Sequence, residues 1–270
     1  MYRLSNGWIG GRDDAGCTRP PPRAAHGLPE HERASSGMLR WRVSTRHVGG
    51  GVRRLFLIRH APTEPLKRGG YIGWSDAPLG ERGMSEARLT GERISKEERI
   101  DAIHASDLLR ARGTAEEISR RLGLGVERRR DFRELGFGEW EGLAHEDLME
   151  RDRERYESWL GNPEDVSPPG GETLAELRGR AHRGLDAAMD EAEREFGVGV
   201  GLAIVAHGGS LRLITCRLLG MPPENHWRLG MDHSGITTFE WPGEAPWEDP
   251  SSLPVLRGFN DLSHLKSDAS

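Results

Sequence analysis

The sequence predicts an α/β fold, specifically a three-layer α/β/α sandwich around a mostly parallel central sheet. Short apolar runs alternate with longer amphipathic stretches from residue 53 onward, which is typical of strands connected by helices. The run Gly201–Ala206 is almost wholly apolar, as expected for a strand that helices cover on both faces. A chain of 270 residues is long enough to form one such domain with a substantial core.

The first half of the predicted domain alternates strands and helices. The sequence predicts a strand over 54–58, a loop to about residue 80, a helix over 85–96, a strand over 100–104, a helix over 108–122 and a short strand near 126–128. The second of these helices should end at Gly123, because glycine readily adopts the left-handed conformation that closes a helix.

The second half contains the clearest helix, which is expected over 173–196. One apolar stripe is formed there by residues at intervals of three and four: Leu174, Leu177, Ala181, Leu185, Ala188 and Ala192. The remaining expected elements are a strand over 201–206, a helix over 210–219 and strands near 236–241 and 253–258. The charged run 146–155 is interpreted as a solvated helical face.

The first fifty residues differ in composition from the rest. They hold eight Arg against two Asp and two Glu, a net charge of +4, whereas the whole chain is formally −5, which leaves −9 for residues 51–270. Residues 1–50 also contain a triple proline and show no sustained hydrophobic period, so we interpret them as a disordered extension before a single domain over 51–270. An acidic domain argues against a broad nucleic-acid surface.

Other classes of protein are disfavoured as well. No stretch approaches the roughly 20 apolar residues of a membrane span, and no apolar signal-peptide core is present at the N-terminus. Only Cys17 and Cys216 are present, so a disulfide framework is not expected, and the cytoplasm is the natural location. Cys216 is expected to be a small core residue. The oligomeric state stays open, with a homo-oligomer as one alternative.

Histidines follow two of the predicted strands directly. Arg59-His60 comes after the strand over 54–58, and His207-Gly208-Gly209 lies between a strand and a helix. Because active sites of such sheets lie beyond the carboxyl ends of the strands, we expect these residues at one edge. The glycines and the free N–H groups of a helix start favour an anion, although a simple strand-to-helix turn is the alternative.

Two further blocks supply candidate partners. The segment 106–112 offers Arg110 or Arg112 at the same edge, and spacing alone does not choose between them. The segment 133–142 interleaves glycines with aromatics and carboxylates, so we read it as a functional loop. Three of its carboxylates could act as an acid: Glu134, Glu139 and Glu141.

These groups together predict phosphoryl chemistry. Arginines and histidines at one edge suit a dianionic phosphoryl group, which a neutral imidazole could attack while a carboxylic acid protonates the leaving oxygen. Zinc held by His60, His207, His233 and Glu134 is the alternative. We disfavour it, because adjacent guanidiniums repel a divalent cation and no His-x-x-x-His or paired-cysteine spacing is present. No metal or other cofactor is therefore expected.

Four blocks in order resemble the histidine phosphatase superfamily, also called the phosphoglycerate mutase-like family. They are Leu57-Ile58-Arg59-His60-Ala61, Ser106-Asp107-Leu108-Leu109-Arg110-Ala111, Arg133 to Gly142 and His207-Gly208-Gly209. The resemblance covers roughly 53–241. It implies that His60 is phosphorylated, that Arg59, Arg110 and His207 bind the phosphoryl group, and that Glu134 is the acid. It selects Arg110 over Arg112.

The resemblance also carries expectations about substrate. We expect a metal-independent phosphomonoester hydrolase that acts on a small phosphorylated metabolite, with substrate contacts from Arg59, Thr63, Gly73, Arg110, His207 and Gly208. A phosphoglycerate mutase-type transfer and a non-catalytic phosphate-binding protein are the alternatives. The short stretch between Gly142 and Gly170 is more similar to small broad-specificity and α-ribazole phosphatases than to mutases.

Some positions depart from the family or stay open. Leu66 stands where many members have asparagine, which should make the entrance more apolar, and Trp74 and Trp140 are candidates for the same wall. His233 precedes a late strand and is a candidate for the border of the pocket. His104 is expected to be an ordinary strand residue. The identity of the phosphate ester is not encoded in these motifs.

Overall fold

The structure, a computed structural model, describes residues 52–64, 69–97, 99–241, 247, 249 and 252–266. The predicted extension over 1–50 and the departure at Leu66 lie outside these residues. Among the helices that the structure describes, none combines the length and the apolar character that a membrane span requires.

A mixed sheet of six strands forms the centre of the domain, in the order β3-β2-β4-β1-β5-β6. The strands are β1 (Arg53–Arg59), β2 (Ala102–Ser106), β3 (Glu127–Arg129), β4 (Gly201–Ala206), β5 (Ile236–Trp241) and β6 (Val255–Asp261). β3, β2, β4 and β1 run parallel to one another, and β5 and β6 are antiparallel additions at the side of β1. The prediction of a mostly parallel sheet is confirmed.

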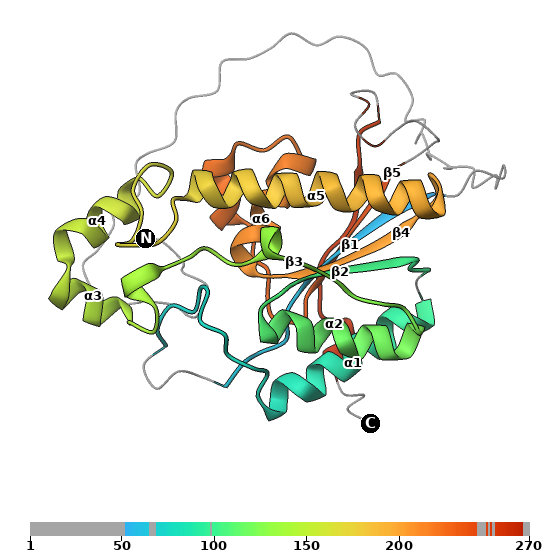
Figure 1. The fold of residues 1–270 in the computed structure, drawn as a ribbon, viewed down its shortest axis with the longest axis horizontal. Coiled ribbons are helices and arrows are strands. Elements are labelled where there is room, and N and C mark those ends of the chain that lie inside the picture. Colours follow the sequence, from blue (N-terminus) through green and yellow to red (C-terminus); the bar gives the residue numbers. More distant parts are fainter. Residues whose placement is uncertain are drawn as a thin grey trace, which may run out of the picture. The chain divides into compact units, whose positions relative to one another are not determined.

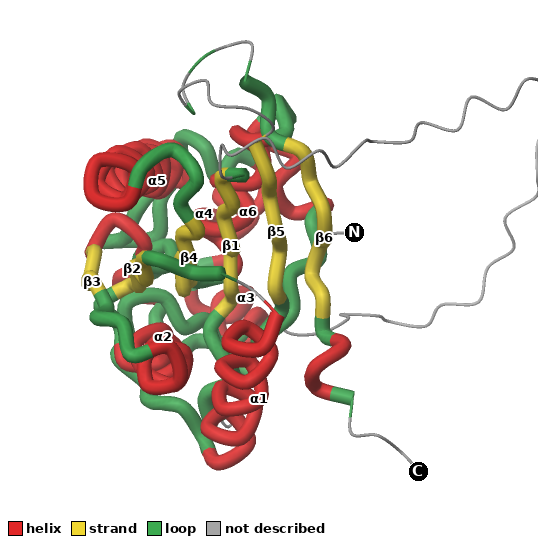
Figure 2. Tube along the Cα trace, turned by 90° about the vertical axis from the view of Figure 1, so that its right-hand side faces the viewer, coloured by secondary structure: helices red, strands yellow, loops and turns green. Residues whose placement is uncertain are grey.

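Helices cover the sheet on both faces (Figure 1). The α-helices are α1 (Glu81–Glu97), α2 (Leu109–Leu122), α3 (His145–Arg151), α4 (Arg153–Gly161), α5 (Leu174–Phe196) and α6 (Gly208–Leu218). Short 3₁₀ helices span Arg130–Phe132, Gly138–Trp140, Pro223–Arg228 and Ser263–Leu265. Figure 2 shows α1 and α2 on one side of the row of strands and α5 on the other.

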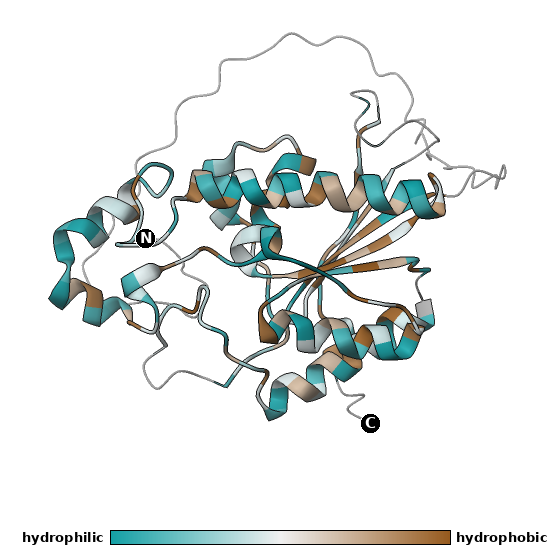
Figure 3. Ribbon diagram, in the orientation of Figure 1, coloured by the Kyte–Doolittle hydropathy of each residue, from teal (hydrophilic) through white to brown (hydrophobic). Residues whose placement is uncertain are grey.

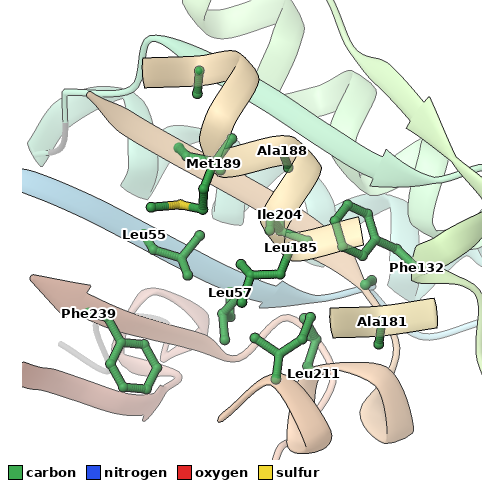
Figure 4. Close-up of a cluster of buried hydrophobic side chains, with 14 of the residues drawn as sticks. Leu55, Leu57, Phe132, Ala181, Leu185, Ala188, Met189, Ile204, Leu211 and Phe239 are labelled. Atoms are coloured by element: carbon green, nitrogen blue, oxygen red, sulfur yellow. The ribbon is translucent and has the colours of Figure 1, made fainter. Parts of the chain in front are cut away.

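The alternation of side chains along β1 explains the three layers. Leu55 and Leu57 pack with residues of α5 and α6 in one core cluster, which Figure 4 shows around Leu185 and Met189. Phe56 and Ile58 pack with residues of α1 and α2 in the other cluster. Successive side chains of a strand point to opposite faces of the sheet. A strand with apolar residues at consecutive positions therefore needs helices on both faces to bury them. The apolar strands and the polar outer sides of the helices are visible in Figure 3.

Some predicted boundaries are wrong. The second strand spans 102–106 instead of 100–104, because Ile100 is an apolar residue that packs in the core just before strand pairing begins. The first helix begins at Glu81 instead of 85. Gly83 lies in its first turn, where a Cβ would come within 1.9 Å of the carbonyl oxygen of Pro62, so this glycine allows close packing. The last strand spans 255–261.

The segment between the 3₁₀ helix Gly138–Trp140 and α5 packs around aromatic side chains. Trp140 is buried against Tyr156 and Trp159, with ring centroids 5.5 Å and 5.8 Å away. Tyr71 joins the cluster through a 2.7 Å hydrogen bond between its hydroxyl and that of Tyr156. Trp140 therefore supports α3 and α4 as a core residue, and Trp74, which is 40% exposed, remains the candidate for an apolar wall.

Candidate active site

The carboxyl ends of three neighbouring parallel strands bring the candidate residues together. β1 and β4 pair with Arg59 opposite Ala206, so the next residues, His60 and His207, lie side by side. The backbone N–H of His60 donates to the carbonyl oxygen of Ala206 at 2.9 Å, and the two imidazole rings have centroids 5.0 Å apart. His60 and His207 are far apart in the sequence, and the pairing of β1 with β4 brings them together at this edge of the sheet.

One nitrogen of the His60 ring is fixed by the backbone. Nδ1 lies 2.7 Å from the carbonyl oxygen of Ala61. Since a carbonyl oxygen only accepts, Nδ1 carries the proton, and in the neutral ring Nε2 keeps its lone pair. Burial lowers the pKa of His60 well below its ordinary value of 6.5, and the neighbouring His207 and His233 lower it further. His60 is thus a neutral imidazole with Nε2 available as a nucleophile.

His207 contributes a second buried imidazole. Its Nε2 lies 2.8 Å from the hydroxyl of Ser106, at the end of β2. Its Nδ1 is buried and has no hydrogen-bond partner within the described part of the chain. Burial lowers the pKa of His207 well below 6.5, and Arg110 and Arg59 contribute to the same effect. A buried ring nitrogen without a partner is costly unless a ligand supplies one.

Arg59 places a cation beside both rings. Its Nη1 donates to the carbonyl oxygen of Met231 at 2.6 Å, and its Nη2 lies 3.2 Å from Nε2 of His233. Its Nε is buried without a partner among the described residues. Burial and the nearby Arg212 lower the pKa of Arg59 to about 10, so the guanidinium remains charged at neutral pH. The unpartnered donor and the charge together fit an anionic oxygen.

The carboxyl group of Glu134 lies at the N-terminus of α6. Both of its carboxyl oxygens lie within hydrogen-bond distance of the backbone N–H of Gly209, at 3.1 Å and 3.0 Å, and Oε1 accepts from the N–H of Leu135. A Cβ at Gly209 would come within 2.2 Å of Oε1, so only glycine allows this approach. From the sequence, the N–H groups at the start of this helix were expected to bind an external anion. In the structure the N–H of Gly209 donates to the carboxyl group of Glu134 instead.

Arg110 lies in the same buried region, but its donors are largely committed. Nη2 donates to the carbonyl oxygen of Gly73 at 2.6 Å, and Nη1 donates to that of Ser75 at 2.9 Å. Arg110 therefore adds positive charge to the site and ties the loop over 72–75 to it. Arg112, the alternative from spacing, is partly exposed and pairs with Glu116 at 3.7 Å.

Glu141 organises the loop that Arg110 holds. Its carboxylate accepts hydrogen bonds from the backbone N–H groups of Gly73, Trp74 and Ser75 and from the Ser75 hydroxyl. It also accepts from the N–H of Phe137. Glu139, the other carboxylate considered from the sequence, is exposed. Of the three candidates in this segment, Glu134 is therefore the one whose carboxyl group reaches the histidine-bearing strand ends.

Gly208, Thr63 and Gly73 are the remaining residues that were predicted to contact the substrate. Gly208 lies beside Arg59, since a Cβ there would be 3.6 Å from the Arg59 Nε. Thr63 lies in the loop after His60, where its backbone forms a β-bridge with Leu79. Gly73 has no space for a side chain, because a Cβ would come within 2.1 Å of the carbonyl oxygen of Leu135. Its role is thus one of close backbone packing.

Three structural partners were not predicted from the sequence. Ser106 hydrogen-bonds His207, and Arg212 lies close enough to Arg59 to lower its pKa. Arg180 on α5 donates to the carbonyl oxygen of Glu134 at 2.7 Å and forms a two-point ion pair with Glu172. Ser106 lies within a block that the sequence singled out, whereas nothing in the helical pattern of α5 distinguishes Arg180 from its neighbours.

Within the described ranges, no group of three or more His, Cys, Asp or Glu is arranged to hold a metal ion. The histidines of the site instead share it with Arg59 and Arg110, whose charge favours an anion. The arrangement can bind a phosphoryl dianion, attack phosphorus through an imidazole and exchange a proton with a carboxyl group.

Comparisons with known proteins agree with this chemistry. The model of the histidine phosphatase superfamily, branch 1, matches residues 55–249. Phosphoserine phosphatase 1 of Hydrogenobacter thermophilus is 33% identical over 184 residues, which cover 68% of this chain and 84% of that protein. The adenosylcobalamin/alpha-ribazole phosphatase of Escherichia coli is 32% identical over 179 residues, 66% of this chain and 85% of that protein. The crystal structure of the alpha-ribazole phosphatase of Shigella flexneri matches with a TM-score of 0.66 and 29% identity, over 77% of this chain and 96% of that one.

Proposed function

The chain belongs to branch 1 of the histidine phosphatase superfamily and is a phosphatase, and we propose that it hydrolyses the monoester of a small phosphorylated metabolite through a phosphohistidine at His60, without a metal ion. One observation carries the mechanism. The hydrogen bond from Nδ1 of His60 to the carbonyl oxygen of Ala61 directs the proton to Nδ1 and leaves Nε2 to attack phosphorus.

The phosphoryl group is held by the donors that have no partner among the described residues. Nε of Arg59 and Nδ1 of His207 are both buried next to His60, and each would donate to one phosphoryl oxygen. Arg110 adds a second guanidinium charge close by. A transferring phosphoryl group gains most from such fixed positive charge, because little else stabilises its transition state.

The reaction proceeds in two steps. Nε2 of His60 forms a bond to phosphorus while the bond to the ester oxygen breaks, and the carboxyl group of Glu134 gives its proton to the departing alkoxide. Water then attacks the phosphohistidine, Glu134 takes a proton from that water, and the bond between Nε2 and phosphorus breaks to release phosphate. Glu134 thus serves as acid and then as base, and the backbone N–H of Gly209 holds it in place.

The substrate is a small phosphate monoester. The relatives named above act, by their names, on phosphoserine and α-ribazole phosphate, which share the phosphoryl group and differ in the rest of the molecule. We assign Thr63 and Gly208 to the border of the phosphoryl site, and Gly208 lies beside Arg59. The exposed face of Trp74 provides an apolar surface near Glu134, whose carbonyl oxygen accepts from Trp74 Nε1 at 2.8 Å. We propose that this side of the site contacts the alcohol portion.

Turnover of p-nitrophenyl phosphate in excess chelator tests this function. We expect full activity with chelator, loss of activity in His60→Ala, and activity close to the parent in His104→Ala, which removes a buried histidine bonded to Arg129 instead. Activity that disappears with chelator, or that survives in His60→Ala, contradicts the proposal. A parallel assay for the isomerisation of phosphoglycerates separates hydrolysis from mutase activity: a mutase would interconvert them faster than it releases phosphate.

A further inference from the structure

His233 lies between the two central groups of the site, the Arg59 guanidinium and the backbone of His60. It belongs to the loop that leads into β5. Its Nδ1 is 3.0 Å from the carbonyl oxygen of His60, and its Nε2 is 3.2 Å from Nη2 of Arg59. Its ring centroid is 4.8 Å from that of His60. The mechanism above uses none of its atoms.

The two contacts fix where the protons of His233 must be. A carbonyl oxygen only accepts, so Nδ1 carries a hydrogen and donates it to His60. A guanidinium only donates, so Nε2 of His233 must hold a lone pair and accept from Arg59. The ring is therefore neutral, with one defined tautomer. A protonated ring would turn the Nε2–H toward the N–H of Arg59, and the two donors would oppose each other.

The contact with His233 determines which part of Arg59 faces the phosphoryl group. Met231 takes one donor from Nη1, at 2.6 Å, and His233 takes one from Nη2. The Nε–H, buried and unpartnered within the described residues, is left for a ligand. Gly208 flanks the same nitrogen, because a Cβ at that position would lie 3.6 Å from it.

We propose that His233 is a positioning residue: its neutral ring aims the Arg59 guanidinium at the phosphoryl group and braces the backbone of the nucleophile His60. This inference rests on the proposed function for its catalytic meaning, but the orientation of Arg59 can be measured without turnover. The hydrogen bonds of His233 go to Arg59 and to the backbone of His60, and its ring lies beside the His60 ring.

The surroundings of His233 keep it in the required state. Burial lowers its pKa to about 4, and the charges of Arg59 and Arg110 act in the same direction, while the hydrogen bond to His60 and the charge of Asp232 oppose them. The ring of His60 faces it as well. At neutral pH the ring is therefore uncharged and able to accept the hydrogen bond from Arg59.

Two amide substitutions separate the two contacts. In His233→Gln the terminal amide reaches roughly as far as Nε2, so its oxygen can still accept from Arg59. In His233→Asn the shorter amide reaches only the Nδ1 position, where its N–H₂ can donate to the His60 carbonyl but no acceptor reaches Arg59. The backbone N–H of Ser234 lies 3.4 Å from the same carbonyl, so the brace on His60 does not depend on His233 alone.

The test is the affinity for inorganic phosphate, measured by titration calorimetry at neutral pH. We expect about tenfold weaker binding in His233→Asn, since one charge-assisted hydrogen bond is lost, and a change of less than about threefold in His233→Gln. The control, His104→Asn, removes another buried histidine that accepts from an arginine, Arg129, and should bind phosphate like the parent. The ratio kcat/KM should fall in the same order as the affinities.

Several outcomes would overturn the inference. Equal phosphate affinity in the Asn and Gln variants, whether both weak or both unchanged, contradicts a role through Arg59. If the Asn variant does not fold, ¹⁵N NMR of the unsubstituted protein decides: we expect a protonated Nδ1 and an unprotonated Nε2 on His233 at pH 7, and the opposite tautomer refutes the proposal. A protein that binds phosphate as expected but shows no turnover would instead refute the proposed function.

Discussion

At the scale of single residues, hydrogen-bond donors and acceptors decide what each group can do. The Ala61 carbonyl directs the proton of the neutral His60 ring to Nδ1 and leaves a lone pair on Nε2, and the Gly209 N–H holds the Glu134 carboxyl group. Sequence motifs identified both of these residues. They gave no information on the tautomer of His60, because that depends on a backbone group whose direction only the folded chain defines.

Glu141 is the residue for which the sequence offered a wrong alternative role. It stood beside Glu134 as a candidate acid, and the structure shows its carboxylate saturated by donors of the loop over 73–75. A carboxylate that accepts several backbone N–H groups fixes the conformation of a loop, and the sequence alone does not distinguish it from a catalytic carboxylate. The hydrogen-bond partners in the folded chain distinguish the two roles, whereas the residue type does not.

We predict that Glu141→Gln destabilises the protein by roughly 1–3 kcal/mol, because the amide nitrogen cannot accept from the backbone donors it would face. Release of this loop also frees the carbonyl groups of Gly73 and Ser75 that hold Arg110, so kcat/KM should fall. Urea denaturation and steady-state kinetics measure both effects. Glu139→Gln is the control, since Glu139 is exposed and should change neither. Equal effects in the two variants would show that Glu141 has no special role.

At the scale of elements, the sequence predicted most strands and helices within a few residues. β4 and β5 match their predicted bounds, because β4 is a continuous apolar run and β5 is rich in β-branched and aromatic residues that favour strands. The predicted range of β2 was displaced by two residues. Ala105 and Ser106 have a low preference for strands, and they pair here because β3 and β4 lie beside them. The packing of Tyr156 and Trp159 of α4 against Trp140 could not be predicted from periodicity, because it depends on contacts between separate segments.

Helix α5 connects the core to the loop that carries Glu134. Arg180 donates to the carbonyl oxygens of Asp131, Arg133 and Glu134 and pairs with Glu172, whose Oε2 also accepts from the N–H of Gly136. One guanidinium thereby holds the backbone on both sides of the proposed acid. The planar, forked shape of arginine suits such a set of acceptors, and lysine does not reproduce it.

We predict that Arg180→Lys lowers the free energy of unfolding by about 2–4 kcal/mol and reduces kcat/KM, because a largely buried ion pair and several carbonyl contacts are weakened together. Arg178→Lys, two residues away on the same helix, alters a more exposed pair with Glu164 and should cost less than about 1 kcal/mol. Chemical denaturation and kinetics of both variants provide the comparison. If Arg180→Lys behaves like Arg178→Lys, Arg180 does not hold the Glu134 loop.

At the scale of the whole molecule, buried neutral histidines link stability to pH. Burial lowers the pKa of His104 and of His233 to about 4, and it lowers those of His60 and His207 well below 6.5. Above pH 6.5 these rings are neutral in the native and the unfolded chain. As the pH falls from 6.5 toward 4, the unfolded chain binds protons that the native chain does not, so stability is lost in that window.

We therefore predict that the free energy of unfolding decreases steadily between pH 6.5 and about 4.5, measured by urea denaturation at several pH values. His104→Gln should show a shallower decrease than the parent, since it removes one of the responsible rings from a place outside the cluster around His60. A free energy of unfolding that stays constant or rises over this range would contradict the neutral state of the buried histidines.

We propose that Nε2 of His60 accepts the phosphoryl group, and trapping of the phosphoenzyme tests this step. The protein is mixed with a phosphate ester, quenched in alkali within milliseconds, and the phosphoryl group is located by mass spectrometry and ³¹P NMR. We expect phosphohistidine at His60 with phosphorus on Nε2, absent from His60→Ala and present in His104→Ala. Phosphorus on Nδ1, on another residue, or on no residue during active turnover would contradict it.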